Sequence, residues 1–215
     1  VEWEGLNIAD ALNLTVEQAL TRFVGDDIRA CLGPVRAVGL GYLTLGHPVS
    51  KLSGGEAQRL KISTVLTDSL REKGDDVSLL ILDEPTTGLH QADVHVLLDV
   101  FSNLVTMGHT VVVVEHNLDV LGQADLLIDL GPEGGNDGGY IVAHGIPAQV
   151  ARQSSSDTGK ALAAYRNALP ISVVRPVAVQ SSNPAAIRLV GARENNLKNI
   201  SVAIPRDELV VITGL

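Results

Sequence analysis

The chain has 215 residues, 45% of them hydrophobic, 19% charged and only 3% aromatic, and its formal net charge is −9. Such a composition allows a sizeable core of Val, Leu, Ile and Ala, which suits buried parallel strands covered by helices. The acidic balance, with no run among the basic residues, argues against a free-standing nucleic-acid binder, and no apolar stretch is long enough to cross a membrane.

The first third of the chain is expected to be helical. Thr15 and Gln18 have the spacing of a capping box, which opens a helix through about Val24. A second helix is expected over residues 26–38, broken near Gly33-Pro34. After a loop, residues 53–56 read Ser-Gly-Gly-Glu, which repeats the capping-box form and starts a helix with apolar residues at helical spacing.

Strands and helices then alternate. Residues 77–82 form a nearly continuous apolar run, typical of a strand buried on both faces, and this run ends at Asp83-Glu84. The elements expected after it are a helix over 92–106, a strand over 110–114, a helix over 117–123 and a strand over 126–130. The alternation predicts an α/β fold with a parallel sheet whose ligands lie at the carboxyl ends of the strands.

The composition changes after Arg152, where Ser and Pro residues mark a linker with one helix near residues 160–167. Further strands are expected over 187–190, 201–204 and 209–213. The expected division is a helical segment (1–52), an α/β core (53–152), a linker (153–186) and the first strands of a following domain (187–215).

The helix start at Ser53, Gly54 and Gly55 has the form of a phosphate site, because the free amides and the positive end of the helix dipole face outward. The alternative for these residues alone is an ordinary capped helix. Gln58 and Arg59, followed by a strand that ends in two carboxylates, favour the phosphate site.

Asp83 and Glu84 suit two tasks: Asp83 can help to hold Mg²⁺ through water, and Glu84 can orient and deprotonate an attacking water. A solvated strand end is the alternative. His116 follows the next strand and can hydrogen-bond a γ-phosphate and the attacking water, although a single His at a strand end is most often a polar loop residue.

Two residue types are assigned no metal. The other five histidines show no metal-ligand spacing, and the single cysteine, Cys31, is expected to be a small buried apolar residue.

The phosphate loop Gly-x-x-x-x-Gly-Lys-Ser/Thr does not occur in the 215 residues, and the chain reaches Gly214 where such a loop would begin. Because the apolar stretches are too short to cross a membrane and the N-terminus has no apolar signal segment, we expect a soluble piece of a longer protein.

Three segments together resemble the signature, the Walker B motif with D-loop, and the switch histidine of ABC-type ATPases: residues 52–59, 79–90 and 111–118. Longer strings at 38–42, 84–90, 115–120 and 129–135 resemble one branch, the UvrA family. This resemblance covers about residues 5–150, as the C-terminal part of the second nucleotide-binding domain. Residues 190–200, 204–207 and 211–215 resemble the beginning of the first such domain. The end of one UvrA-like unit thus precedes the beginning of another, as in a tandem or duplicated UvrA-like protein.

The resemblance implies ATP and Mg²⁺ as cofactors. It implies that Ser53, Gly54, Gly55 and Gln58 act on ATP held by a different nucleotide-binding domain or protomer, while Asp83, with its Mg²⁺, belongs with Glu84 and His116 to this domain's own site. For the whole protein it implies DNA and UvrB as partners, zinc modules outside this segment, and a cytoplasmic location without membrane contact. The isolated 215 residues are expected to bind nucleotide weakly and to hydrolyse essentially none. A UvrA-like resistance or transport-associated ATPase, and a non-catalytic interaction module, are the alternatives.

Overall fold

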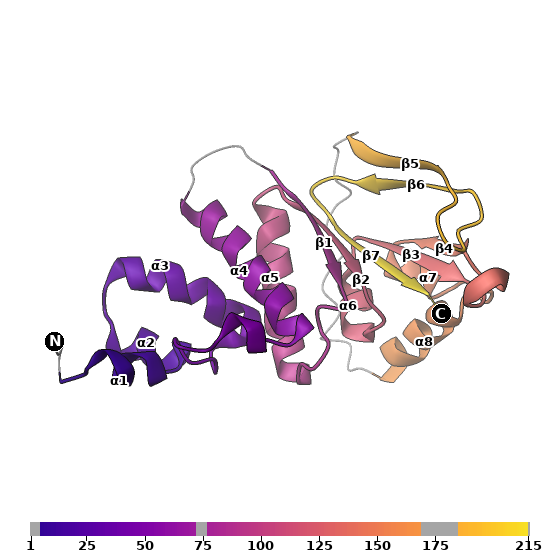
Figure 1. Cartoon of the computed structure of the whole chain (residues 1–215). Helices are drawn as coiled ribbons and strands as arrows, with labels where there is room; N and C mark the ends of the chain where they lie inside the picture. Colours follow the sequence, from indigo (N-terminus) through magenta and orange to yellow (C-terminus); the bar gives the residue numbers. More distant parts are fainter. Residues whose placement is uncertain (1–4, 72–76, 169–184, 215) are drawn as a thin grey trace. The chain divides into compact units, whose positions relative to one another are not determined.

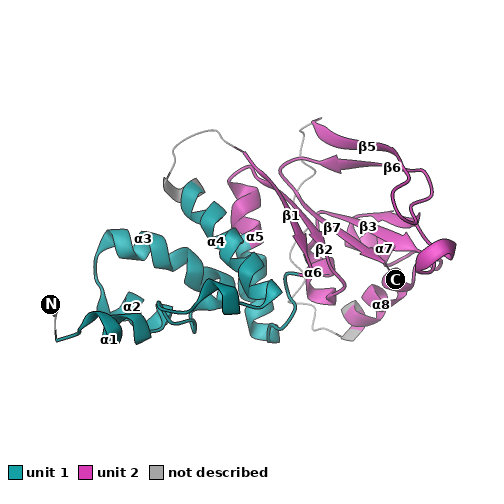
Figure 2. Ribbon diagram, in the orientation of Figure 1, with its two compact units in different colours: residues 1–76, 85–100 teal, residues 77–84, 101–215 magenta. Residues whose placement is uncertain are grey.

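The computed structural model describes residues 5–71, 77–168 and 185–214. The chain forms two compact units, coloured separately in Figure 2. Unit 1 holds the described residues up to 71 together with 85–100, and unit 2 holds 77–84 and the described residues from 101 onward. Among the described residues, no helix is both long and apolar enough to span a membrane.

Unit 1 is helical, as expected from its sequence (Figure 1). Its elements are α1 (Ile8–Asn13), α2 (Val16–Arg22), α3 (Asp26–Val35), a π-helical turn η1 (Arg36–Leu40), a 3₁₀ turn η2 (Val49–Lys51), α4 (Gly54–Arg71) and the first part of α5 (Gln91–Thr106). The capping box at Thr15 is confirmed: its hydroxyl accepts from the Gln18 amide at 3.1 Å, and its own amide donates to Gln18 Oε1 at 2.9 Å.

The expected helix break at Gly33-Pro34 is wrong. Helix α3 runs through Pro34 to Val35 and continues into η1, and the backbone leaves helical geometry only at Val38 and Gly39. Gly39 has φ +76°, a left-handed conformation that glycine adopts without steric cost. A proline inside a helix removes one N–H donor and crowds the carbonyl four residues earlier, yet α3 continues past Pro34. The single cysteine also differs from expectation, because Cys31 on α3 is exposed.

Unit 2 is built on a five-stranded sheet with the order β1-β2-β7-β3-β4. Its strands are β1 (Leu79–Asp83), β2 (Thr110–Val114), β3 (Leu126–Gly131), β4 (Tyr140–Gly145) and β7 (Leu209–Gly214). All neighbours pair in parallel except β3 and β4, so the expected parallel α/β core is confirmed, with one antiparallel edge strand. The remaining elements are the helices α6 (Leu118–Gln123), α7 (Pro147–Val150) and α8 (Asp157–Ala168), the 3₁₀ turn η3 (Gly135–Asp137) and the hairpin strands β5 (Ala186–Ala192) and β6 (Ile200–Pro205).

The centre of this sheet is the core of unit 2. Val111, Val113, Val210 and Val211 on β2 and β7 are fully buried. The expectation that the first strand is buried on both faces is wrong, because β1 lies at the edge of the sheet and alternates between exposed and buried residues. Its Ile81 is 68% exposed. A run of apolar residues therefore did not distinguish an edge strand from a central one.

The last strand lies in the middle of the sheet. β7 pairs in parallel with β2 on one side and with β3 on the other, although 77 residues (132–208) separate it from β3 in the chain. The β5–β6 hairpin packs on the same sheet: Ile204 of β6 belongs to one apolar cluster with Val112, Ile128 and Val210. In this chain β7 completes the five-stranded sheet of unit 2, and β5 and β6 form a separate two-stranded sheet. That they also open a following domain in a longer protein stays a prediction.

The expected linker begins with an ordered helix. Helix α8 carries the fully buried Leu162, and Ser156 and Thr158 hold its start by donating to the buried carboxylate of Asp129 on β3 at 2.6 Å and 3.0 Å. The rest of the expected linker, residues 169–184, lies outside the described residues.

Candidate functional site

The N-terminus of α4 carries a set of hydrogen bonds that orient Ser53. The Ser53 amide donates to Oε2 of Glu56 at 2.7 Å, and the Ser53 hydroxyl accepts from the Glu56 amide at 3.3 Å. The Tyr42 hydroxyl donates to the other carboxylate oxygen of Glu56. The expected capping box is thus confirmed. Ser53 Oγ accepts one hydrogen bond here, and its hydroxyl can rotate to donate its proton either to Glu56 or to an incoming anion.

These contacts keep Glu56 ionised. The hydrogen bond from Tyr42, followed by those from the Ser53 amide and hydroxyl, lowers the pKa of Glu56 to about 2. Burial and the neighbouring Glu56 carboxylate in turn raise the pKa of Tyr42. A carboxylate at the first turn of a helix is also favoured by the helix dipole.

The two glycines of the motif have different surroundings. A methyl group added at Gly54 would meet no atom within 4 Å, so a ligand can approach the backbone there. A methyl group at Gly55 would lie 3.1 Å from the carbonyl oxygen of Thr87, in the turn at 85–88 that follows β1. Gln58, one turn further along α4, is half-buried. Three of the four expected phosphate-side residues therefore lie at the helix start, and Gln58 lies behind them.

The carboxylates and the histidine come together in unit 2. Asp83 ends β1, and Glu84 follows it with φ +43°, a left-handed conformation that is uncommon outside glycine. The Glu84 amide donates to the Val114 carbonyl at 2.9 Å, so Glu84 is held against the end of β2. His116 Nδ1 lies 3.9 Å from Glu84 Oε1, and their side chains are 75% and 55% exposed. The structure thus brings Glu84 and His116 to one edge, at a separation too long for a direct hydrogen bond.

One residue of this edge was assigned no role from the sequence. Glu115 is 2% exposed, and its Oε2 accepts from the amides of His116 at 2.8 Å and Asn117 at 3.0 Å. It fixes the backbone that carries His116. The available signal was a carboxylate placed between a buried strand and the histidine, since a buried charge needs donors of its own.

Strand β7 ends at the same edge of the sheet. The Glu115 amide donates to the Ile212 carbonyl at 3.0 Å, and Thr213 pairs with Asp129. Because carboxyl ends of parallel strands meet at one edge, the end of β7 joins Asp83, Glu84 and His116 there. The exposed carboxylate oxygens of Asp83 and Glu84 are suitable donors for Mg²⁺. No group of three or more potential metal-ligating side chains was found in the described part of the chain.

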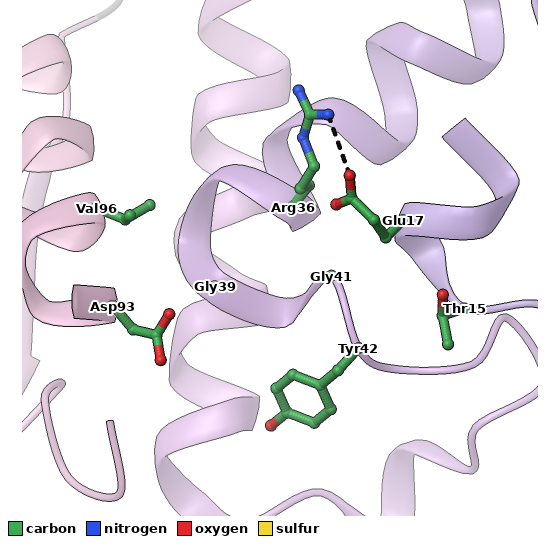
Figure 3. Close-up of a pocket in the computed structure, with 8 residues that line it drawn as sticks. All are labelled: Thr15, Glu17, Arg36, Gly39, Gly41, Tyr42, Asp93 and Val96. Carbon is green, nitrogen blue, oxygen red and sulfur yellow. Dashed lines mark ion pairs between the residues drawn. The ribbon is translucent and has the colours of Figure 1, made fainter. Parts of the chain in front are cut away.

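Unit 1 also contains an open hollow of about 410 Å³, shown in Figure 3. Its lining residues are Thr15, Glu17, Arg36, Gly39, Gly41, Tyr42, Asp93 and Val96. Arg36 and Glu17 point toward each other, with Nη1 3.6 Å from Oε1. Both side chains are largely exposed, so this pair is weak. Among its lining residues, Tyr42 also bonds Glu56 at the start of α4.

Known proteins similar to this chain share one description. No family model matches the chain. UvrABC system protein A of Aquifex aeolicus is 52% identical over 166 residues, which are 77% of this chain. The protein of the same name from Chlamydia pneumoniae is 41% identical over 214 residues, or 99% of this chain. The crystal structure of UvrA2 from Deinococcus radiodurans superposes with a TM-score of 0.69 at 47% identity and covers 76% of this chain. This chain belongs to the UvrA family.

The chain spans only a small part of its UvrA relatives. It covers 18% of the Aquifex aeolicus protein, 11% of the Chlamydia pneumoniae protein and 20% of the Deinococcus radiodurans chain. Since 166 residues are 18% of the first, that protein has about 900 residues, and since 214 residues are 11% of the second, it has about 1,900. The relative that matches this chain almost from end to end is therefore about twice as long as the other.

Proposed function

We propose that this chain is part of a UvrA-type ATPase of nucleotide excision repair and supplies halves of two ATP sites. The observation that carries the proposal is the edge of unit 2, where Glu84 and His116 approach to 3.9 Å at the carboxyl ends of parallel strands. A left-handed glutamate at that edge costs free energy, and such strain persists mainly at functional sites.

In the catalytic half, Asp83 helps to hold Mg²⁺ through water, and Glu84 takes a proton from the attacking water. His116 hydrogen-bonds the γ-phosphate, and Glu115 holds the backbone of His116 in place through its two amide contacts. Bound Mg²⁺ neutralises charge on the phosphates, and it also offsets the repulsion between two neighbouring carboxylates.

In the signature half, Ser53, Gly54 and Gly55 meet the phosphates of ATP held by another nucleotide-binding domain or protomer. The exposed Ser53 hydroxyl donates, and the open space at Gly54 admits a phosphate oxygen to the helix N-terminus. Gln58, which is half-buried one turn further along α4, contributes to the same phosphate site.

The wider assignments rest on the family. DNA and UvrB are the partners of the whole protein, zinc is held outside this segment, and the protein is cytoplasmic. The tandem arrangement is supported by the Chlamydia pneumoniae relative, which matches 99% of this chain and has about twice the length of the Aquifex aeolicus protein. In such a protein the division of this chain is 1–52, 53–152, 153–186 and 187–215.

The test is ATP turnover by the full-length protein with and without ultraviolet-damaged DNA, beside the isolated 215 residues and the full-length variant Glu84→Gln. We expect damage to change the rate, Glu84→Gln to lower it by about 10²-fold or more, and the isolated chain to show essentially none. If the ATP turnover rate is the same with and without damaged DNA, the result favours a UvrA-like resistance or transport-associated ATPase. A full-length rate unaffected by Glu84→Gln leaves only a non-catalytic interaction module.

A further inference from the structure

Arg59 is a buried cation on the signature helix. It is only 3% exposed, whereas arginine is almost never buried without partners. Its Nη1 donates to the carbonyl of Pro85 at 3.3 Å, and Pro85 directly follows Glu84 in the chain. The guanidinium thus reaches from α4 to the turn at 85–88, and both ends of this contact lie in unit 1.

The same side chain borders the start of the helix. Nη1 of Arg59 lies 3.4 Å from the position of a methyl group on Gly55, which is itself close to the Thr87 carbonyl. The positive charge also favours the ionised forms of Tyr42 and Glu56, with a smaller effect than burial has on Tyr42 or than the Tyr42 hydrogen bond has on Glu56. Arg59 therefore acts on the group that orients Ser53 and on the turn that follows Glu84.

One N–H donor of the Arg59 guanidinium is unused among the described residues. Its Nε is buried and has no hydrogen-bond partner among the described residues. A buried N–H without a partner costs free energy, so an ordinary structural arginine in this place would be expected to use it. Arg59 therefore has one N–H donor that is not used by the described residues.

We propose that Arg59 is a positioning residue that couples the signature helix to the turn after Glu84. When a nucleotide binds at Ser53 and moves the start of α4, Arg59 moves the turn at 85–88 with it. This turn directly follows Glu84, the catalytic glutamate of the other half-site. This inference rests on the proposed function. A planar fork of donors is needed for it, because one group must serve the turn and the helix start together, and a lysine has only a single point of charge.

The test uses the full-length protein with Arg59→Lys, Arg59→Met and, as a matched control on the exposed side of the same helix, Lys61→Met. We expect both Arg59 variants to lower kcat for ATP by about 10-fold to 100-fold, as for small misplacements of catalytic groups. The KM for ATP should change by less than about 2-fold, because Arg59 does not touch the nucleotide. Lys61→Met should match the unchanged protein in both.

Hydrogen–deuterium exchange gives a second measurement that does not depend on turnover. Arg59→Lys should speed amide exchange in two places, the turn at 85–88 and the first turn of α4, and Lys61→Met should not. Wild-type kcat in Arg59→Lys overturns the proposal, and so does a fall in kcat that the loss of folded protein accounts for in full. If the unchanged protein hydrolyses no ATP, the proposed function fails. Unchanged exchange in Arg59→Lys would still reject the link between helix and turn on its own.

Discussion

Gly55 and Thr87 approach so closely that a methyl group on Gly55 would lie 3.1 Å from the Thr87 carbonyl oxygen. The neighbouring Gly54 has nothing within 4 Å of the same position. Two adjacent glycines at the start of α4 therefore differ in what they permit. Gly54 leaves the backbone open to a ligand, and Gly55 allows the helix to pack against the turn that follows Glu84.

This difference predicts opposite effects on stability. Gly55→Ala should lower the free energy of unfolding by about 1–3 kcal/mol, because the added methyl group must displace a backbone carbonyl. Gly54→Ala should be neutral or raise it by up to about 1 kcal/mol, since alanine restricts the unfolded chain and fits a helix. Urea unfolding of the two variants, prepared in parallel, measures both values. Equal losses in the two would show that Gly55 does not pack against the turn.

The lowered pKa of Glu56 predicts that the free energy of unfolding falls at low pH. Its pKa falls to about 2 in the folded chain from an ordinary value of 4.5, so the native state releases this proton more readily than the unfolded state. The stabilisation is complete above about pH 4.5 and is lost as the pH falls toward about 2. Glu56→Gln should therefore remove part of the loss of stability across this window. Unfolding free energies at about pH 5 and about pH 3 measure it.

The control for Glu56 is Glu17→Gln, which removes an exposed carboxylate paired with Arg36 in the same unit. It should leave the acid dependence nearly as it is in the unchanged protein, because exposed pairs contribute little. The interpretation of Glu56 is wrong if the two variants flatten the pH dependence equally.

The raised pKa of Tyr165 predicts that the free energy of unfolding falls at high pH. Its hydroxyl donates to Oδ1 of Asp119, which joins α8 to α6. That hydrogen bond, with burial and the charge of Asp119, raises the pKa of Tyr165 to about 12 from 10.0. The contact therefore stabilises the fold fully below about pH 10 and is lost as the pH rises toward about 12. Tyr165→Phe should remove the tyrosinate absorbance change that appears last in an alkaline titration. A titration in which the last change persists would exclude this contact.

Local signals in the sequence predicted local structure well. The capping boxes at Thr15 and Ser53 depend on residues three positions apart, and both formed as expected. The strands before Asp83 and His116 were also found, because each is marked by its own run of apolar residues, although only the second is buried along most of its length. The site residues at the ends of these elements followed from their positions.

Relationships between distant segments could not be predicted in the same way. The place of β7 between β2 and β3 depends on which strand edges meet, and nothing within residues 209–214 specifies that choice. The exposure of Ile81 could not be predicted either, because it depends on the place of β1 at the edge of the sheet. The roles of Glu115 and Arg59 depend on partners that only the folded chain brings to them.

The contact between Asp129 and Ser156 gives a last prediction, for the segment expected to be a linker. Ser156 is fully buried; its hydroxyl donates to Asp129 Oδ2 at 2.6 Å and accepts from the Gly159 amide at 2.7 Å. Ser156→Ala should lower the free energy of unfolding by about 1–3 kcal/mol, because it leaves a buried carboxylate short of a donor and a buried amide without this acceptor. Lys160→Ala, which breaks an exposed pair with Asp157 on the same helix, should cost less than about 1 kcal/mol. Denaturant unfolding compares the two. If Ser156→Ala costs no more than Lys160→Ala, α8 is not held to β3 by this contact, and residues 153–168 behave as the linker that their composition suggests.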